Sequence, residues 1–493
     1  MNRKINFAHR EVLVYESDTD KRPVAFEPFF WDSIERSKLH YAHLPFHSMN
    51  KKQMEDHYGI TFPVSRKKLE IEHKDLYQSI IYSSIHYPLI DTHVEHNTIQ
   101  NFLDRGENML IPIITDSEEV FKIDHNNLHI DDYIIKYIKE GRIKLMLTMH
   151  HEGHFHQPTY IDWVNKFCDK FNLTSDEVYF VNSNLHSDVL CEQYEKITNT
   201  PNRFTVITTP YFEHRPWFLP NENCTIHKIY TKRALYSQFF DKLENNTKQH
   251  KKSKFLCFNR RLDAHRVLTV AQLKSNEHTV DHIASLGTAH YEPHEVKQYY
   301  GYLEGSYDLE KLTDSYRVKK KAKELLDIAP IEIDGNTYMV NYAENLNEDL
   351  HTDSFVNIVT ESLFGPTSIF FSEKIYKPMY CAQPFIMVGN PFSLKKLREQ
   401  GYRTFDKWWD ESYDEEVDFI KRMNKLEQVY EFIGKKTYEE LRQMLFEMEE
   451  VLMNNFNVLM SSKRLHDLVD TLEDLCESNT NVEPTVNKTK SII

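Results

Sequence analysis

Glycine is scarce in this chain, with 12 residues among 493, and neither a Walker-type phosphate loop nor a dinucleotide-binding glycine fingerprint is present. A phosphate group would therefore have to be held by side chains. The six cysteines are scattered without a CxxC pair, which favours reduced, buried thiols over a disulfide framework. No signal-like segment and no apolar run of membrane-spanning length occurs, so we expect a cytoplasmic protein without a membrane partner.

The chain also lacks an excess of basic residues. Acidic residues outnumber basic residues by 75 to 60, which gives a formal net charge of −15. This disfavours a broad, non-specific nucleic-acid surface, because counterion release requires a basic face. Apolar residues make up 40% and aromatic residues 13% of the chain, enough to fill large cores. At 493 residues the chain is too long for one ordinary core, so we expect two domains.

The second half of the chain contains a clear succession of strand and helix patterns. Residues 355–359 (FVNIV) and 384–388 (PFIMV) are short, apolar runs that predict buried strands. Between them, residues 373–381 (EKIYKPMYC) fit a short helix that begins near Lys374. Two strands joined by a helix over so short a span predict a parallel βαβ layer and an α/β fold.

Charged side chains collect at the predicted strand-to-helix ends of this layer, where open α/β sheets bind ligands. Glu361 follows the first strand, and Glu373, Lys374 and Lys377 open the helix. Since Lys374 and Lys377 share a helix face, they suit phosphate oxygens, while Glu373 suits sugar or ribose hydroxyls. The alternative is a solvated helix face on which Glu373 only complements the helix dipole.

A resemblance favours the first interpretation. Residues 372–414, SEKIYKPMYCAQPFIMVGNPFSLKKLREQGYRTFDKWWDESYD, resemble the nucleotide-sugar-binding half of GT-B glycosyltransferases, similar to fucosyltransferases and exostosin-like enzymes and common in tailed-phage and marine viral genomes. Residues 254–266, KFLCFNRRLDAHR, resemble the group's strand that ends in clustered arginines. The resemblance covers roughly 160 residues of the second half. No comparable match precedes residue 140.

The resemblance implies two Rossmann-like domains facing one another across a cleft, with a C-terminal helical segment crossing back. It implies that Glu373 and Lys374 contact the sugar and the diphosphate of the donor, and that Arg260 or Arg261 meets the pyrophosphate. It also implies an inverting, metal-independent reaction with a nucleotide-diphosphate sugar as substrate and no other cofactor. For a viral protein, the compartment would be the host cytoplasm.

Composition shifts along the chain suggest where its domains begin and end. Residues 241–254 (DKLENNTKQHKKSK) are polar without apolar periodicity, which predicts an interdomain linker. The expected division, from the first residue to the last, is an N-terminal extension 1–70, an acceptor domain 71–240, the linker, a donor domain 255–415, C-terminal helices 416–476 and a disordered tail 477–493.

The first half contains one unusual local composition. A strand pattern at residues 144–149 runs into HHEGHFHQP, which holds four histidines and Glu152. The His151-Glu-Gly-His154 spacing is one residue short of the HExxH zinc motif, and Gly153 would interrupt the helix that this motif requires. A loop beyond a strand end can instead aim a general base across a cleft, for which Glu152 and His151 are the candidates. The alternative is a histidine-rich loop that takes no part in chemistry. An Asp18-Thr-Asp20 triplet also has the form of a metal-binding DxD motif.

We therefore expect a glycosyltransferase that moves a sugar to a hydroxyl acceptor on a glycan, a protein or a modified DNA base. Two alternatives remain open at the level of the sequence. The chain can be a virion or structural protein with a degenerate glycosyltransferase fold. It can also be a metal-dependent hydrolase that uses the loop from His150 to His156.

Overall fold

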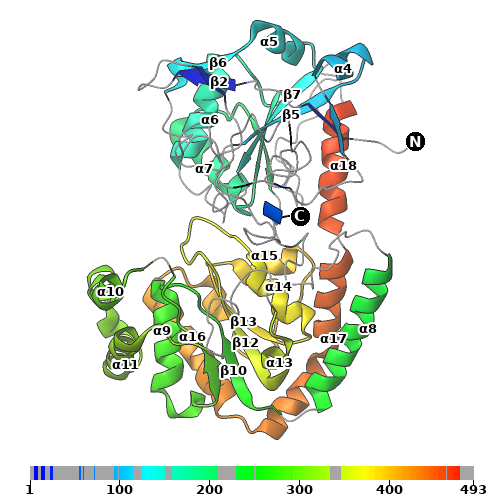
Figure 1. Cartoon of the computed structure of the whole chain (residues 1–493). Coiled ribbons are helices and arrows are strands. Elements are labelled where there is room, and N and C mark those ends of the chain that lie inside the picture. The colour runs from blue at the N-terminus through cyan, green and yellow to red at the C-terminus, as the bar shows by residue number, and fades with distance from the viewer. Residues whose placement is uncertain are drawn as a thin grey trace. The chain divides into compact units, whose positions relative to one another are not determined.

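The computed structural model describes two compact units, each formed around its own parallel sheet (Figure 1). The described residues are 5–8, 13–16, 23–25, 94–97, 99–114, 124–149, 158–208, 213, 229–248, 251–289, 291–333, 346–461, 463–477 and isolated positions between 55 and 72. The first unit comprises Met1–Arg215 and Lys463–Ile493, and the second comprises Pro216–Ser462. The predicted α/β class is confirmed, and the C-terminal segment returns to the first unit.

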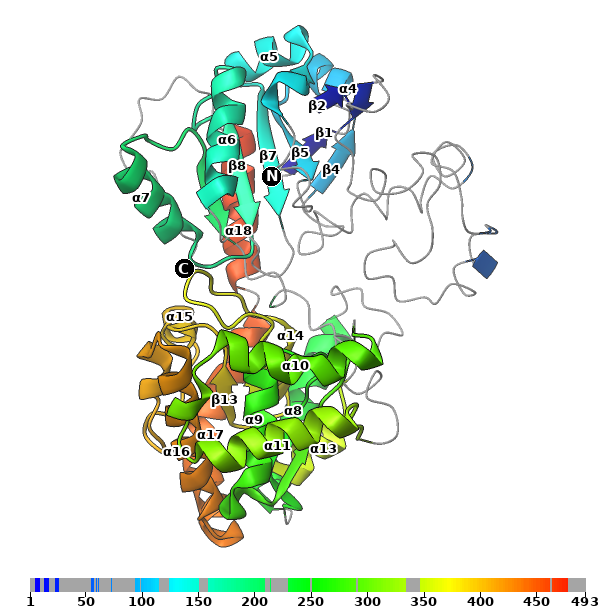
Figure 2. The same ribbon diagram turned by 90° about the vertical axis from the view of Figure 1, so that its left-hand side faces the viewer.

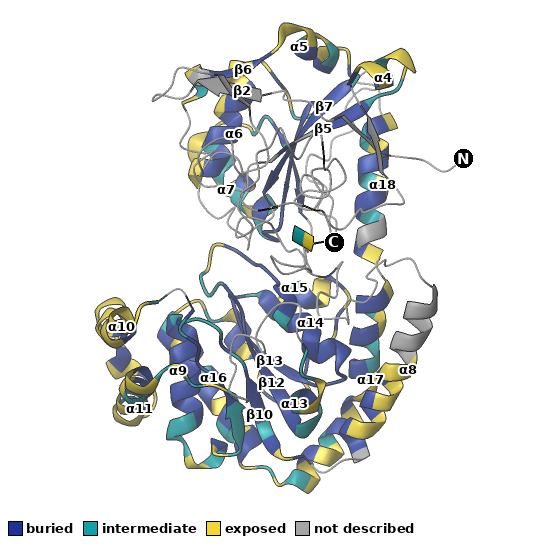
Figure 3. Cartoon of the chain, in the orientation of Figure 1, coloured by how far each residue is buried: buried dark blue, intermediate teal, exposed yellow. Residues whose placement is uncertain are grey.

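The first unit contains a six-stranded parallel sheet. Its strands, in spatial order, are β4 (Val94–Asn97), β1 (Ile5–Ala8), β5 (Met109–Ile114), β7 (Ile143–Met149), β8 (Val178–Asn182) and β9 (Thr205–Thr208). A smaller antiparallel sheet joins β3 (Pro23–Ala25), β2 (Leu13–Glu16) and β6 (Leu128–Ile130). Every residue of β7 is buried (Figure 3), as expected for a central strand covered on both faces.

The two faces of this sheet pack against different helices. Alternate residues of β7, such as Leu145 and Leu147, join one core cluster with α5 (Asp132–Lys139) and α6 (Pro158–Lys170). Met146, between them, joins a second cluster with the C-terminal helix α18 (Lys463–Glu477). The remaining described helices of this unit are α4 (Ile99–Asp104) and α7 (Ser187–Thr198).

Helix α18 is held on the first unit by polar as well as apolar contacts. The guanidinium group of Arg464, in α18, forms a buried, bidentate ion pair with Glu213. The buried ammonium group of Lys144, from β7, donates to the carbonyl oxygen of Leu475. The C-terminal helix is therefore an integral part of this unit.

The second unit contains a four-stranded parallel sheet. Its strands, in spatial order, are β11 (His282–Ala284), β10 (Ser253–Cys257), β12 (Ser354–Thr360) and β13 (Phe385–Val388). The predicted strands at 355–359 and 384–388 and the helix between them are confirmed to within a residue. From β10 the chain proceeds to β11 on one side, whereas from β12 it proceeds to β13 on the other. The direction of winding therefore reverses between β10 and β12.

Helices surround this sheet. Helix α9 packs against α11, which packs against α10 (Figure 2), and α17 packs against both α8 and α14. The described helices of this unit are α8 (Ile229–Lys248), α9 (Ala264–Ser275), α10 (Pro293–Ser306), α11 (Ser315–Ile328), α13 (Glu348–Asp353), α14 (Glu373–Tyr380), α15 (Ser393–Glu399), α16 (Phe419–Gly434) and α17 (Tyr438–Ser461). None of the described helices has the length and apolar composition needed to cross a membrane.

The expected linker at 241–254 is wrong. Helix α8 continues to Lys248, β10 begins at Ser253, and the boundary between the units lies after Arg215. The segment is polar although part of it is buried, because its polar side chains form hydrogen bonds with the rest of the unit. The amide nitrogen of Asn246, for example, is buried and donates to the carbonyl oxygens of Cys381 (2.7 Å) and Ala382 (3.1 Å).

Candidate functional site

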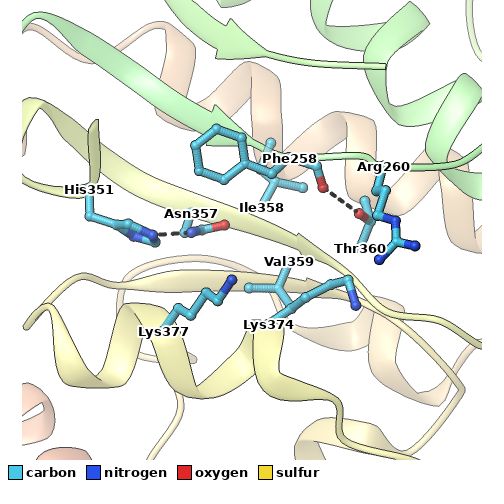
Figure 4. A pocket seen from close by; sticks show the side chains of 9 residues that line it. All are labelled: Phe258, Arg260, His351, Asn357, Ile358, Val359, Thr360, Lys374 and Lys377. Carbon is cyan, nitrogen blue, oxygen red and sulfur yellow. Dashed lines mark hydrogen bonds between the residues drawn. The ribbon is translucent and has the colours of Figure 1, made fainter. Parts of the chain in front are cut away.

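A pocket opens in the second unit between the ends of β10 and β12 and one face of α14 (Figure 4). It measures about 400 Å³ including its open mouth. This position is the point at which the winding of the sheet reverses, where open α/β sheets bind their ligands. The lining residues are Phe258, Arg260, His351, Asn357, Ile358, Val359, Thr360, Lys374 and Lys377.

Three cationic side chains converge on this pocket from two separate segments. Arg260 follows β10, whereas Lys374 and Lys377 extend from the first turns of α14 toward β12 (Figure 4). The side chain of Lys374 is 25% exposed, and Lys377 is 7% exposed. The sequence predicted all three as ligand contacts, and the structure brings them together. A cluster of this kind attracts an anion with more than one charge.

The start of α14 supports the same charge preference. The hydroxyl oxygen of Ser372 caps the helix by accepting from the backbone N–H of Lys374 (3.4 Å). Glu373 is the first helical residue, and its Oε1 accepts from Nζ of Lys374 at 2.9 Å. Burial acts to raise the pKa of Glu373, but the charges of Lys374 and Lys377 outweigh it and lower that pKa. Glu373 is therefore a carboxylate beside the pocket.

Glu361 does not line the pocket, although the sequence predicted it as a donor contact. Its side chain is fully buried, and its carboxylate accepts from the hydroxyl group of Ser372 (2.5 Å) and from the backbone N–H of Ser372. Burial raises the pKa of Glu361 to about 7. This arrangement fixes the N-cap of α14, so Glu361 positions Lys374 indirectly, through Ser372.

Arg261 is engaged next to the pocket. Its Nε donates to Asp263 at 3.1 Å, and its Nη2 donates to the carbonyl oxygen of Ser362 at 3.3 Å. Of the two adjacent arginines that the sequence proposed, Arg260 is therefore the one among the lining residues.

Glycine at position 287 permits the close packing that fixes Arg260. A Cβ atom at this position would lie 2.2 Å from the carbonyl oxygen of Arg260, which is too close for any other residue. The backbone N–H of Gly287 donates to the carbonyl oxygen of Asn259 at 2.7 Å, and the side chain of Asn259 accepts from Thr360 at 2.7 Å. The loop after β10 is thus joined to both neighbouring segments.

Sequence reasoning missed the inner end of the pocket. His351, from α13, is bonded through Nδ1 to Gln383 at 2.7 Å and lies 3.3 Å from the Asn357 amide. Burial lowers the pKa of His351 to about 4, so the ring is neutral at physiological pH. No sequence signal marks His351, because it is a single histidine in a short helix, and strand and helix periodicity do not show that it meets β12.

Two carboxylates near the end of the resembling segment 372–414, Glu411 and Asp414, stabilise the fold. The Asp414 carboxylate caps α15 by accepting from the backbone N–H groups of Leu394 (2.9 Å) and Lys395 (3.0 Å). Glu411 accepts from the backbone N–H of Phe405 at 2.8 Å and from Arg398 at 3.1 Å. These two carboxylates serve local structure.

The candidate general bases, His151 and Glu152, lie outside the described residues, as do the rest of the His150–His156 loop and the Asp18-Thr-Asp20 triplet. Within the described ranges, no three His, Cys, Asp or Glu side chains gather as metal ligands.

No family model matches the chain, and no curated protein matches it. Among solved structures, the chain is similar to a glycosyltransferase from Rickettsia africae ESF-5, with 12% identity over 77% of this chain and 93% of that chain and a TM-score of 0.33.

Proposed function

We propose that this protein is a glycosyltransferase that takes a sugar from a nucleotide-diphosphate donor and transfers it to a hydroxyl acceptor. The observation that carries the proposal is the meeting of Arg260, Lys374 and Lys377 in one pocket at the reversal of the second sheet. The sequence resemblance to GT-B donor-binding halves supports it, because the resembling segments, 254–266 and 372–414, supply these three cations.

Each of these side chains has a role in the proposed reaction. Departure of a diphosphate leaves negative charge on its oxygens, and Arg260, Lys374 and Lys377 would stabilise that charge without a metal ion. Glu373 would accept hydrogen bonds from hydroxyl groups of the transferred sugar. Glu361 and Ser372 would hold the start of α14 in position.

For activation of the acceptor hydroxyl group, the candidate residues come from the sequence alone. His151 or Glu152 would remove the proton from the incoming hydroxyl group, and a direct attack of this kind inverts the configuration of the sugar. The acceptor would be a glycan, a protein or a modified DNA base.

Ligand-induced stabilisation tests the donor site. A panel of ADP, GDP, UDP and CDP with their common sugar conjugates is screened by thermal shift, because a ligand that binds only the folded state raises the midpoint. We expect at least one member to stabilise the wild type and to lose its effect with Lys374→Ala. Lys320→Ala is the matched control, since Lys320 is 63% exposed on α11. A well-folded protein that responds to no member would contradict the proposal.

A further inference from the structure

Lys377 differs from the other two cations of the pocket in its burial. Lys377 is buried, at 7% exposed, whereas Arg260 and Lys374, one helical turn earlier on the same face of α14, are only half-buried. Its ammonium group points toward the inner end of the pocket, near Asn357 and His351 (Figure 4). A ligand that fills the pocket would therefore bring its charge beside a lysine that is almost removed from water.

The groups around Lys377 determine how readily it holds its proton. Glu373 and Lys374 share its helix, Cys381 follows that helix, His351 belongs to α13, and Arg260 follows β10. Burial lowers the pKa of Lys377 to about 8, with Glu373 opposing and Lys374 adding to the effect. In the empty pocket, part of the Lys377 population is therefore uncharged at mildly alkaline pH.

We propose that Lys377 takes up a proton from solvent when a diphosphate enters the pocket, and so makes binding selective for the more highly charged phosphate. The inference rests on the proposed function, in which this pocket binds the diphosphate of a nucleotide. A phosphate oxygen beside Nζ favours the ammonium form, because opposite charges attract strongly where water is excluded. The proton moves from solvent to Nζ, and no other bond forms or breaks.

The selectivity has a consequence for the reaction. Cleavage of the bond between the sugar and the diphosphate leaves one additional negative charge on the departing phosphate. A lysine that becomes fully charged only beside an anion stabilises the departing diphosphate more than the intact donor. Lys377 thereby contributes to the transition state and to tight binding of the nucleotide product.

Titration calorimetry tests the proton uptake directly. The nucleoside diphosphate that gives the largest thermal shift is titrated at pH 8 in two buffers of different ionisation enthalpy. For a group with a pKa of about 8, we expect uptake of about half a proton per ligand in the wild type. Lys377→Met and Lys377→Arg should reduce the uptake to near zero, because methionine does not ionise and arginine keeps its proton throughout.

The pH profile gives an independent readout. Wild-type affinity should fall about tenfold between pH 7 and pH 9, the change in the protonated fraction of such a group. The terminal phosphate is already largely ionised over this range. Affinity of the Lys377→Arg variant should stay level, and the exposed-site control Lys320→Met should follow the wild type. Thermal midpoints without ligand confirm that each variant is folded.

These titrations distinguish the role of Lys377 from the existence of the diphosphate site. Diphosphate binding with no proton uptake and a level pH profile in the wild type overturns the role of Lys377 and leaves the donor pocket intact. Absence of binding by every nucleoside diphosphate overturns both.

Discussion

Nζ of Lys374 lies 2.9 Å from Oε1 of Glu373, so the pair at the start of α14 is joined before any ligand binds. A phosphate that reaches Lys374 must compete with this carboxylate. With protonated Lys377 and Arg260 nearby, the cluster nevertheless keeps a net positive charge. Under the proposed function, Glu373 would therefore moderate the attraction for a bare diphosphate and would accept hydrogen bonds from the hydroxyl groups of an attached sugar.

Removal of the Glu373 charge should separate these two effects. For Glu373→Gln, we expect free nucleoside diphosphate to bind about three- to tenfold more tightly, because Lys374 no longer has a competing carboxylate. The preference for the sugar conjugate over the diphosphate should fall. Calorimetry with both ligands measures the two constants. Glu399→Gln, at an exposed carboxylate on α15 that pairs with Lys396, is the control. Weaker diphosphate binding by Glu373→Gln would count against this account.

Gly287→Ala should displace the backbone of Arg260. The added Cβ would lie 2.2 Å from its carbonyl oxygen, and overpacking of this kind costs about 1–3 kcal/mol. We expect a lower free energy of unfolding and weaker diphosphate binding. The control is Gly305→Ala in α10, where a Cβ meets no atom within 4 Å. This variant should be slightly more stable than the wild type, because alanine favours a helix. Unchanged ligand affinity in Gly287→Ala would separate Arg260 from the binding site.

Glu361 should make stability depend on pH. Its pKa is raised from 4.5 to about 7 by burial, so the folded state binds this proton more tightly than the unfolded state. The wild-type free energy of unfolding therefore loses about 3 kcal/mol from this group as pH rises from 4.5 to above 7. Glu361→Gln cannot ionise and does not undergo this loss. The difference in free energy of unfolding between the variant and the wild type, measured with denaturant at pH 4.5 and above pH 7, should therefore shift in favour of the variant as the pH rises. Parallel pH profiles would contradict this assignment.

The ion pair between Arg464 and Glu213 gives a prediction for the first unit. Glu213→Leu leaves a buried guanidinium group without its carboxylate, which costs about 3–5 kcal/mol. We expect faster proteolysis within α18 and a lower melting midpoint. The double variant Glu213→Leu/Arg464→Met removes both charges and should recover most of the loss. A double variant as unstable as the sum of both single variants would exclude coupling between the two side chains.

The strands and helix around the candidate pocket were predictable because local signals agree with the fold. An apolar run places β12, Ser372 caps α14, and Lys374 and Lys377 share one face of that helix. The meeting with Arg260 was predictable in outline from the resemblance of residues 254–266, which implies that Arg260 or Arg261 contacts the same diphosphate as Lys374.

Other parts of the site depend on contacts between distant segments and could not be derived in this way. Glu361 looks like an accessible strand-end carboxylate, and only its partner Ser372 shows that it is buried. Gly287 acquires its role from Arg260, and His351 from Gln383 and Asn357. The polar residues of 241–248 were mistaken for a linker because their burial depends on carbonyl groups after α14.

The most direct measurement is calorimetric titration of the nucleoside diphosphates into the wild type, Arg260→Ala and Lys374→Ala, with Lys320→Ala as control. The account predicts saturable one-to-one binding of at least one diphosphate by the wild type and the control, and a loss of at least tenfold in each pocket variant, about 1.4 kcal/mol. Equal affinity in all four proteins would place the ligand elsewhere and contradict the assignment of the donor pocket.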